Sequence, residues 1–133
     1  MNTHASGPFD VKLTPQPAGE NADFAFVGTL LLDKQFHGDL KATSKGIMLA
    51  AGTHVKNSAG YVALELVNGT LHGRRGTFVL QHSGLMNRGE GQLVIHVVPD
   101  SGTDELAGLS GSMAIIIEGG KHSYAFDYRF PEA

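Results

Sequence analysis

Three polar side chains interrupt two otherwise apolar stretches near the middle of the chain. Glu65 lies within Tyr61–Val67, and Gln81 and His82 end the stretch Thr77–His82. A carboxylic acid among apolar groups can act as a general acid or base, and an imidazole can shuttle a proton or hold a ligand carbonyl. We therefore take Glu65 and His82 as the candidate catalytic residues.

The direction of the Glu65 side chain decides its role. If it points into the protein, desolvation would raise the pKa of its carboxyl group. If it points outward, it is a solvated surface carboxylate. Side chains alternate along a strand, and Val62, Leu64 and Leu66, on the face opposite Glu65, form the more apolar set. Both directions therefore stay open.

His82 shares one face of its stretch with Phe78 and Leu80, so we expect it to point to the same side as these apolar side chains. There it is either a functional group or a structural donor to a backbone carbonyl. Gln81 is predicted to point the opposite way.

The long alternating stretch Phe36–Leu49 supplies further candidates. Its even-numbered positions include Ala42, Ser44 and Gly46, and small residues suit the tightly curved interior of a barrel. Such a lumen could hold a ligand. The candidate ligand-binding residues are Tyr61, Glu65, Phe78, Leu80, His82, Ser44, Met48 and His96.

Seven histidines raise the question of a metal site. None is spaced as H-x-H or H-E-x-x-H, although neighbouring strands could bring His82 and His96 together. The absence of cysteine excludes thiolate zinc sites, iron–sulfur clusters and a cysteine nucleophile. We expect neither a metal nor a cofactor.

Apolar and polar residues alternate with period two along most of the chain, and glycine-rich turns separate the alternating runs. Asp33-Lys34 is predicted to be one of these turns, and one short helical turn is expected near 101–109. The predicted strands are Phe9–Leu13, Asp23–Leu32, Phe36–Leu49, Tyr61–Val67, Thr77–His82, Gln92–Val98, Met113–Glu118 and Ser123–Phe130.

These strands predict an all-β fold, an antiparallel β-barrel of about eight strands in a single domain spanning residues 1–133. Residues 1–7 are polar and are expected to be a mobile tail. Crossover helices, which parallel α/β folds require, are missing from the pattern.

Composition narrows the class of partner. The formal net charge is −3 and no basic stripe is present, so nucleic acid is not expected. No export signal is recognisable and no apolar run reaches the length of a membrane span, so we expect a cytoplasmic protein without membrane attachment. The face formed by Tyr124, Phe126, Tyr128 and Phe130 could line a ligand cavity or pack an oligomer interface. The second is the commoner use, and a homo-oligomer is expected.

Several segments together resemble a bacterial family of unknown function whose members adopt an allene-oxide-cyclase-like barrel. The resemblance covers nearly the whole chain, and its most specific part is Val97–Gly111. It implies a small antiparallel barrel that is often oligomeric, and it implies no particular reaction. The other matching segments are Thr3–Ala5, Phe9–Lys12, Phe36–Leu40, Gly60–Glu65, Gly76–Gly84 and Tyr124–Tyr128.

Three functional hypotheses follow. The first is a binding protein whose lumen holds a small apolar molecule, oriented by one or two inward polar groups. The second is a cofactor-independent isomerase or cyclase, in which Glu65 or His82 moves a proton. The third is a structural, oligomerising protein with a packed lumen.

Overall fold

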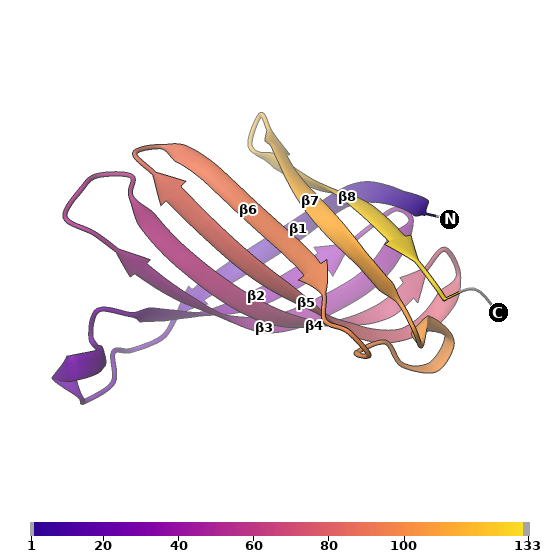
Figure 1. The fold of residues 1–133 in the computed structure, drawn as a ribbon, viewed down its shortest axis with the longest axis horizontal. Coiled ribbons are helices and arrows are strands. Elements are labelled where there is room, and N and C mark those ends of the chain that lie inside the picture. The colour runs from indigo at the N-terminus through magenta and orange to yellow at the C-terminus, as the bar shows by residue number, and fades with distance from the viewer. Residues whose placement is uncertain (1, 132–133) are drawn as a thin grey trace.

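Eight runs of alternating buried and exposed side chains form strands that pair antiparallel in chain order and close on themselves (Figure 1). The structure, a computed structural model, describes residues 2–131. It confirms the predicted all-β, eight-stranded antiparallel barrel. The strands are β1 (Thr3–Pro15), β2 (Gly28–Phe36), β3 (Leu40–Gly52), β4 (Ala59–Leu71), β5 (Arg74–Asn87), β6 (Glu90–Val97), β7 (Ser110–Glu118) and β8 (Lys121–Arg129).

Three of the hairpins have turns with two successive residues of positive φ, a backbone that only a few residue types adopt easily, and one of these turns is Gly119-Gly120 between β7 and β8. His72 and Gly73 join β4 to β5, and Arg88 and Gly89 join β5 to β6, and all four have positive φ. Two such residues in succession match the right-handed twist of the flanking strands. These turns hold long neighbouring strands in register.

The barrel closes between β1 and β8, from Thr3 opposite Tyr128 to Phe9 opposite His122. The predicted mobile tail is therefore wrong for Thr3–Gly7, which is part of β1. The reason is the ladder to the last strand, a contact far away in sequence, together with the full burial of Ala5. Met1 lies outside the described residues.

One end of the barrel, which we name the closed end, is filled by a cluster of aromatic side chains. Tyr124 is central to it: its hydroxyl donates to the carbonyl of His37 at 2.6 Å and accepts from the backbone N–H of Leu40 at 2.8 Å. Its ring packs edge-on against Phe36, and the rings of Phe126 and Tyr128, which are also buried, pack against each other. These side chains of β8 form the core, so the predicted use of this face as an interface or a cavity wall is wrong for them.

The connection from β6 to β7 covers the closed end. It contains a 3-10 turn at Asp104–Leu106, which confirms the predicted short helical turn. Leu106 and Leu109 are buried, and Thr103 accepts from the backbone N–H of Thr77 through its hydroxyl. Within residues 2–131 the only other helical element is a three-residue turn at Ala22–Phe24, so no helix there could cross a membrane.

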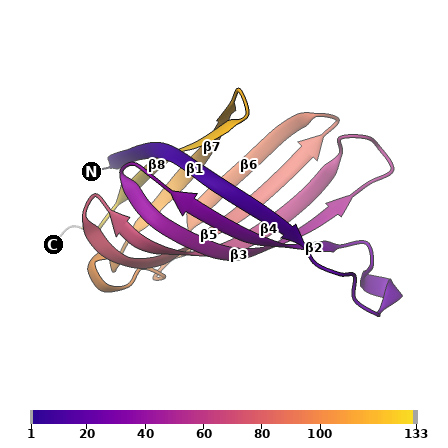
Figure 2. The same cartoon turned by 180° about the vertical axis from the view of Figure 1, so that it is seen from behind.

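The first hairpin differs from the prediction. Asp23 lies in the loop, and β2 begins only at Gly28. Figure 2 shows this loop extending away from the barrel beyond β1 and β2. Asp33 and Lys34 are not a turn: both lie inside β2, and the chain reverses after Phe36. Lys34 continues the inward alternation of its strand and is buried.

The opposite end, which we name the open end, has a weak seam. β6 and β7 pair only through Ile95–Met113 and His96–Ser112, whereas the other neighbouring strands share seven or more pairs. The rest of the two strands diverge toward the open end (Figure 1). The closed end is therefore the rigid base of the barrel.

Candidate functional site in the barrel interior

Four polar side chains meet inside the barrel, where apolar groups are the rule. Lys34 Nζ lies 2.9 Å from Oε2 of Glu65, and Nε2 of His82 lies 3.3 Å from the same oxygen. The Glu65 side chain is fully buried, and those of Lys34 and His82 are at most 5 % exposed. Ser44 is buried with them. We name these four residues the polar cluster.

The strand register brings the polar cluster together from four neighbouring strands. Lys34 of β2 is directly opposite Ser44 of β3. Glu65 of β4 is opposite Gly46, and His82 of β5 is opposite Ala63. A Cβ atom at Gly46 would lie only 2.7 Å from Cβ of Glu65, so the missing side chain lets β3 and β4 approach each other closely beside Glu65.

Aromatic rings complete the surroundings of the lysine. Its ammonium group lies 5.3 Å from the ring centre of Phe9 and 5.8 Å from that of Phe36. The electron-rich ring faces attract a cation at these distances. Lys34 therefore meets one carboxylate and two rings in place of water.

The charge state of Glu65 reflects opposing effects. Burial raises the pKa of its carboxyl group, but the contact with His82 and the positive charge of Lys34 together outweigh burial, so the pKa lies below its ordinary value. The expected increase of this pKa is therefore wrong, because the lysine was not anticipated. Glu65 is a carboxylate at neutral pH.

Two oxygen atoms of the polar cluster have no partner among the described residues. They are Oε1 of Glu65 and Oγ of Ser44. Oε2 is held by its charged neighbour rather than by an aligned hydrogen bond. A buried carboxylate oxygen without a donor is costly, so the polar cluster can accept a hydrogen bond from a molecule in the lumen.

The Glu65 side chain points into the barrel. The other predicted ligand-binding residues differ in direction and in burial. Tyr61 and Met48 point inward and are half-buried toward the open end. Phe78 and Leu80 point inward but are fully buried in the core. Gln81 points outward, as predicted.

His96 is a wrong prediction. It is opposite Gln81 on the outer face and is exposed, whereas His82 is opposite the buried Ile95. Because neighbouring residues on a strand point to opposite faces, the two histidines cannot share a site. Among residues 2–131, no three His, Asp or Glu side chains are grouped so that they could hold a metal ion.

Lys34 is a candidate site residue that is not among those predicted from the sequence. The sequence did contain a signal, because Leu30, Leu32, Lys34 and Phe36 occupy alternate positions of one run. The dipeptide Asp33-Lys34 also has the composition of a turn, which is what the sequence analysis predicts there. Its buried position depends on Glu65, which is 31 residues away in the chain.

A hollow of about 700 Å³ occupies the open end. Apolar side chains that point inward line it but remain exposed: Met86 is 43 % exposed, Leu93 39 % and Ile117 63 %. Inward apolar groups that water still reaches indicate a lumen that the protein's own side chains do not fill.

Tyr61 lies between this hollow and the polar cluster. It lines the hollow, and it is two inward positions from Glu65 along β4. Its ring covers Gly84, where a Cβ atom would come within 2.2 Å of the ring. Burial raises the pKa of the Tyr61 hydroxyl.

Comparison with known proteins places the chain in a family. The family model described as "Protein of unknown function (DUF3224)" matches residues 5–128. A crystal structure of a DUF3224 protein of unknown function from Shewanella oneidensis MR-1 is 52% identical, with a TM-score of 0.92 and complete coverage of both chains. No curated protein matches. The chain therefore belongs to the DUF3224 family of proteins of unknown function.

Proposed function

We propose that this protein binds a small, largely apolar molecule in the barrel lumen, in the cytoplasm as the sequence predicts. The buried Glu65 carboxylate, with one oxygen that forms no hydrogen bond with any residue of the described part of the chain, is the observation that carries the proposal. Tyr61, which lines the apolar hollow of the open end, is two inward positions from Glu65, and the volume of this hollow suits such a molecule. A ligand with an apolar body could fill the hollow, and its hydroxyl or N–H group could donate a hydrogen bond to the Glu65 carboxylate.

The charge state of Glu65 supports binding more than catalysis. A carboxylate whose pKa is lowered has no proton to donate at neutral pH, and it is a weak base. The cyclase or isomerase remains a second candidate because Nε2 of His82 lies close to the carboxylate, as a proton-transfer pair would require. The allene-oxide-cyclase-like resemblance belongs with this second candidate.

Native mass spectrometry of the freshly purified protein, followed by denaturing extraction, tests the proposal directly. A stoichiometric small molecule bound to the protein is the expected result. The location of binding is tested with 1-naphthol as the probe. Ala63→Phe, which fills the lumen between Tyr61 and Glu65, should weaken 1-naphthol binding at least tenfold. Leu64→Phe, the outward neighbour on the same strand, is the matched control and should not. Equal binding to both variants would place the probe outside the lumen and contradict the proposal.

A second comparison tests the role of the polar cluster. 1-Naphthol and 1-methoxynaphthalene differ in one hydrogen-bond donor. A hydrogen bond to a charged group contributes about 1.5–3 kcal/mol, so 1-naphthol should bind roughly 10- to 100-fold more tightly. The preference should disappear in the double variant Lys34→Met/Glu65→Leu, which removes both charges. A preference that survives in this variant would exclude Glu65 as the acceptor.

A further inference from the structure

The outer surface of the barrel carries a continuous apolar area on one side. Seven large aliphatic side chains of β2–β5 point outward and are each 42–61% exposed. We name this area the outer apolar face; it consists of Leu31, Ile47, Leu49, Val62, Leu64, Leu66 and Leu85.

The register shows that these side chains are neighbours. Ile47 of β3 is opposite Leu31 on one side and Leu64 on the other. Leu49 is opposite Val62 one step further toward the open end. A groove of about 860 Å³ runs along this face, with Leu64 in its lining. Leu64 is the centre of the outer apolar face.

Outside this face, the described strands carry only two exposed large aliphatic side chains that point outward, Val94 of β6 and Ile116 of β7. The outward positions of β1 and β8 carry polar and charged groups, among them Asp10, Lys12, Asp127 and Arg129. The outside of the barrel is therefore apolar on one side and polar on the other. A barrel that was surrounded by water on all sides would have no reason to concentrate half-exposed leucines in one area.

The size of the outer apolar face fits a protein interface. At about 90 Å² for each half-exposed side chain, the seven contribute roughly 600 Å². This exposed apolar area equals the upper end of the range for the largest apolar patch on a monomer, about 300–600 Å². It approaches the roughly 800 Å² that each partner buries in a standard protein interface.

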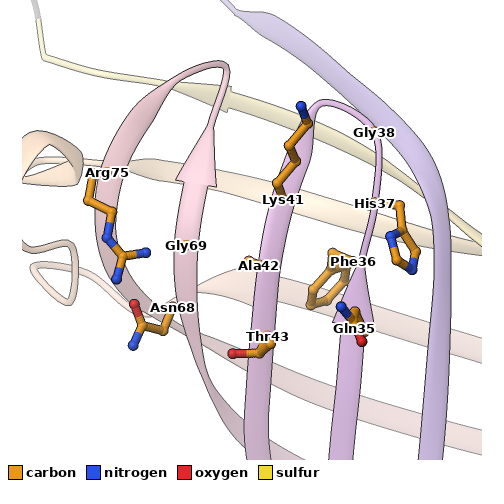
Figure 3. Close-up of a pocket in the computed structure, with 10 residues that line it drawn as sticks. All are labelled: Gln35, Phe36, His37, Gly38, Lys41, Ala42, Thr43, Asn68, Gly69 and Arg75. Carbon is orange, nitrogen blue, oxygen red and sulfur yellow. The ribbon is translucent and has the colours of Figure 1, made fainter.

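A polar border surrounds the outer apolar face, as in the rim of an interface. Toward the closed end, Gln35, Thr43 and Asn68 form one row across three strands, with Lys41 and Arg75 beside it (Figure 3). At one edge, Lys45 and Asp33 form an exposed ion pair of 2.9 Å. The charged groups thus lie around the aliphatic centre and not within it.

We propose that the outer apolar face is the interface of a homodimer, in which the same face of a second copy covers it. An uncharged sheet surface of aliphatic side chains can pack on an identical surface about a two-fold axis, as two sheets do in a sandwich. A membrane fits less well, because the chain has a net charge of −3 and Lys45 is neutralised by Asp33. The inference does not depend on the proposed ligand.

Sedimentation velocity of the full chain from about 1 to about 100 µM tests the proposal. The wild-type protein should sediment as a dimer. Leu64→Arg places a charge at the centre of the outer apolar face and should raise the dissociation constant at least about 100-fold, which leaves a monomer. Ile116→Arg is the matched control: Ile116 is an outward, 41%-exposed residue of β7, away from the face, and its variant should remain a dimer.

Each other outcome overturns the proposal. A wild-type protein that is monomeric at about 100 µM excludes the dimer, and if it then sediments with anionic lipid vesicles, the face is a membrane surface. A Leu64→Arg protein that stays dimeric places the interface elsewhere. If dissociation instead requires Phe24→Ser/Phe26→Ser, the two exposed phenylalanines of the first loop form the contact. Far-UV circular dichroism establishes that each variant is folded, and Leu66→Gln replaces Leu64→Arg if that variant is not.

Discussion

At the scale of single residues, the ion pair of Lys34 and Glu65 is the feature of the barrel that costs the most desolvation free energy. Both side chains are almost completely removed from water, and each compensates the other's charge. Removing one partner leaves an uncompensated buried charge, whereas removing both leaves an apolar interior. The two kinds of substitution should therefore have very different effects on stability.

We predict that Lys34→Met lowers the free energy of unfolding by about 3–5 kcal/mol, because the Glu65 carboxylate then remains buried without its cation. Lys34→Met/Glu65→Leu should recover most of this loss. Urea denaturation at neutral pH measures both values. Equal destabilisation of the single and the double variant would contradict the assignment of Lys34 as the principal partner of Glu65.

The lowered pKa of Glu65 predicts how stability depends on pH. The unfolded chain, with a glutamate pKa of about 4.3, binds a proton at a higher pH than the folded protein does. The contribution of Glu65 is therefore fully present above the unfolded pKa and is lost as the pH falls through the lower, folded pKa. The wild-type protein should lose more stability between about pH 5 and pH 3 than Lys34→Met/Glu65→Leu. Parallel curves of unfolding free energy against pH would show that Glu65 does not contribute.

At the scale of elements, two connections between strands differ most in strength. The Tyr124 hydroxyl joins β8 to the β2–β3 connection through two hydrogen bonds, and we name this contact the latch. The seam between β6 and β7, in contrast, has only two residue pairs. The first lies at the closed end and the second opens toward the open end. Local stability should follow this difference.

Tyr124→Phe is predicted to lower the free energy of unfolding by about 1–3 kcal/mol, because the buried N–H of Leu40 loses its acceptor. Thermal or urea denaturation measures the change. Tyr61→Phe is the control, since no described residue forms a hydrogen bond with the Tyr61 hydroxyl. A comparable loss in both variants would mean that the hydroxyl group as such, and not the latch, is responsible.

Hydrogen exchange should be fastest along the seam. The residues of β7 from Ala114 to Glu118 have no ladder partner on the side of β6, so the amides that face this side lack a backbone acceptor. We expect lower protection there than in β4, whose two ladders are complete over thirteen residues each. Amide exchange followed by NMR or mass spectrometry distinguishes the two. Uniform protection across β4 and β7 would show that something else covers the seam.

At the scale of the whole molecule, closure depends on the first strand. β1 pairs with β2 along one half and with β8 along the other, so it links the beginning of the sheet to its end. Without the part that pairs with β8, the sheet would have two long free edges. The barrel should therefore unfold as one cooperative unit only when this strand is intact.

We predict that deletion of residues 1–8 abolishes the cooperative unfolding transition and increases aggregation, because it removes most of the β1–β8 ladder. Deletion of residues 1–2, which precede the ladder, is the control and should leave the transition unchanged. Calorimetry and light scattering measure both effects. An unchanged transition in the longer deletion would show that closure is not required for folding.

The architecture and the family were both predictable from the amino-acid sequence. Alternation with period two is a local property, and turns such as His72-Gly73 are defined by neighbouring residues, so eight antiparallel strands follow without any long-range information. The helical turn before Leu106 and the inward set around Ser44 were predictable for the same reason. The inward direction of His82 was predictable because it shares one face of β5 with Phe78 and Leu80.

Which face of a strand is inside the barrel, and what surrounds Glu65, depend on contacts between strands that are distant in the chain. In β4 the more apolar set, with Leu64 at its centre, is outside, and the set that contains Glu65 is inside. Parity tells which side chains share a face, but it cannot tell which face is the lumen when both are largely apolar. The polar cluster needs Lys34 from another strand to compensate the carboxylate, and a pairing between residues so distant in the chain exists only once the barrel has closed.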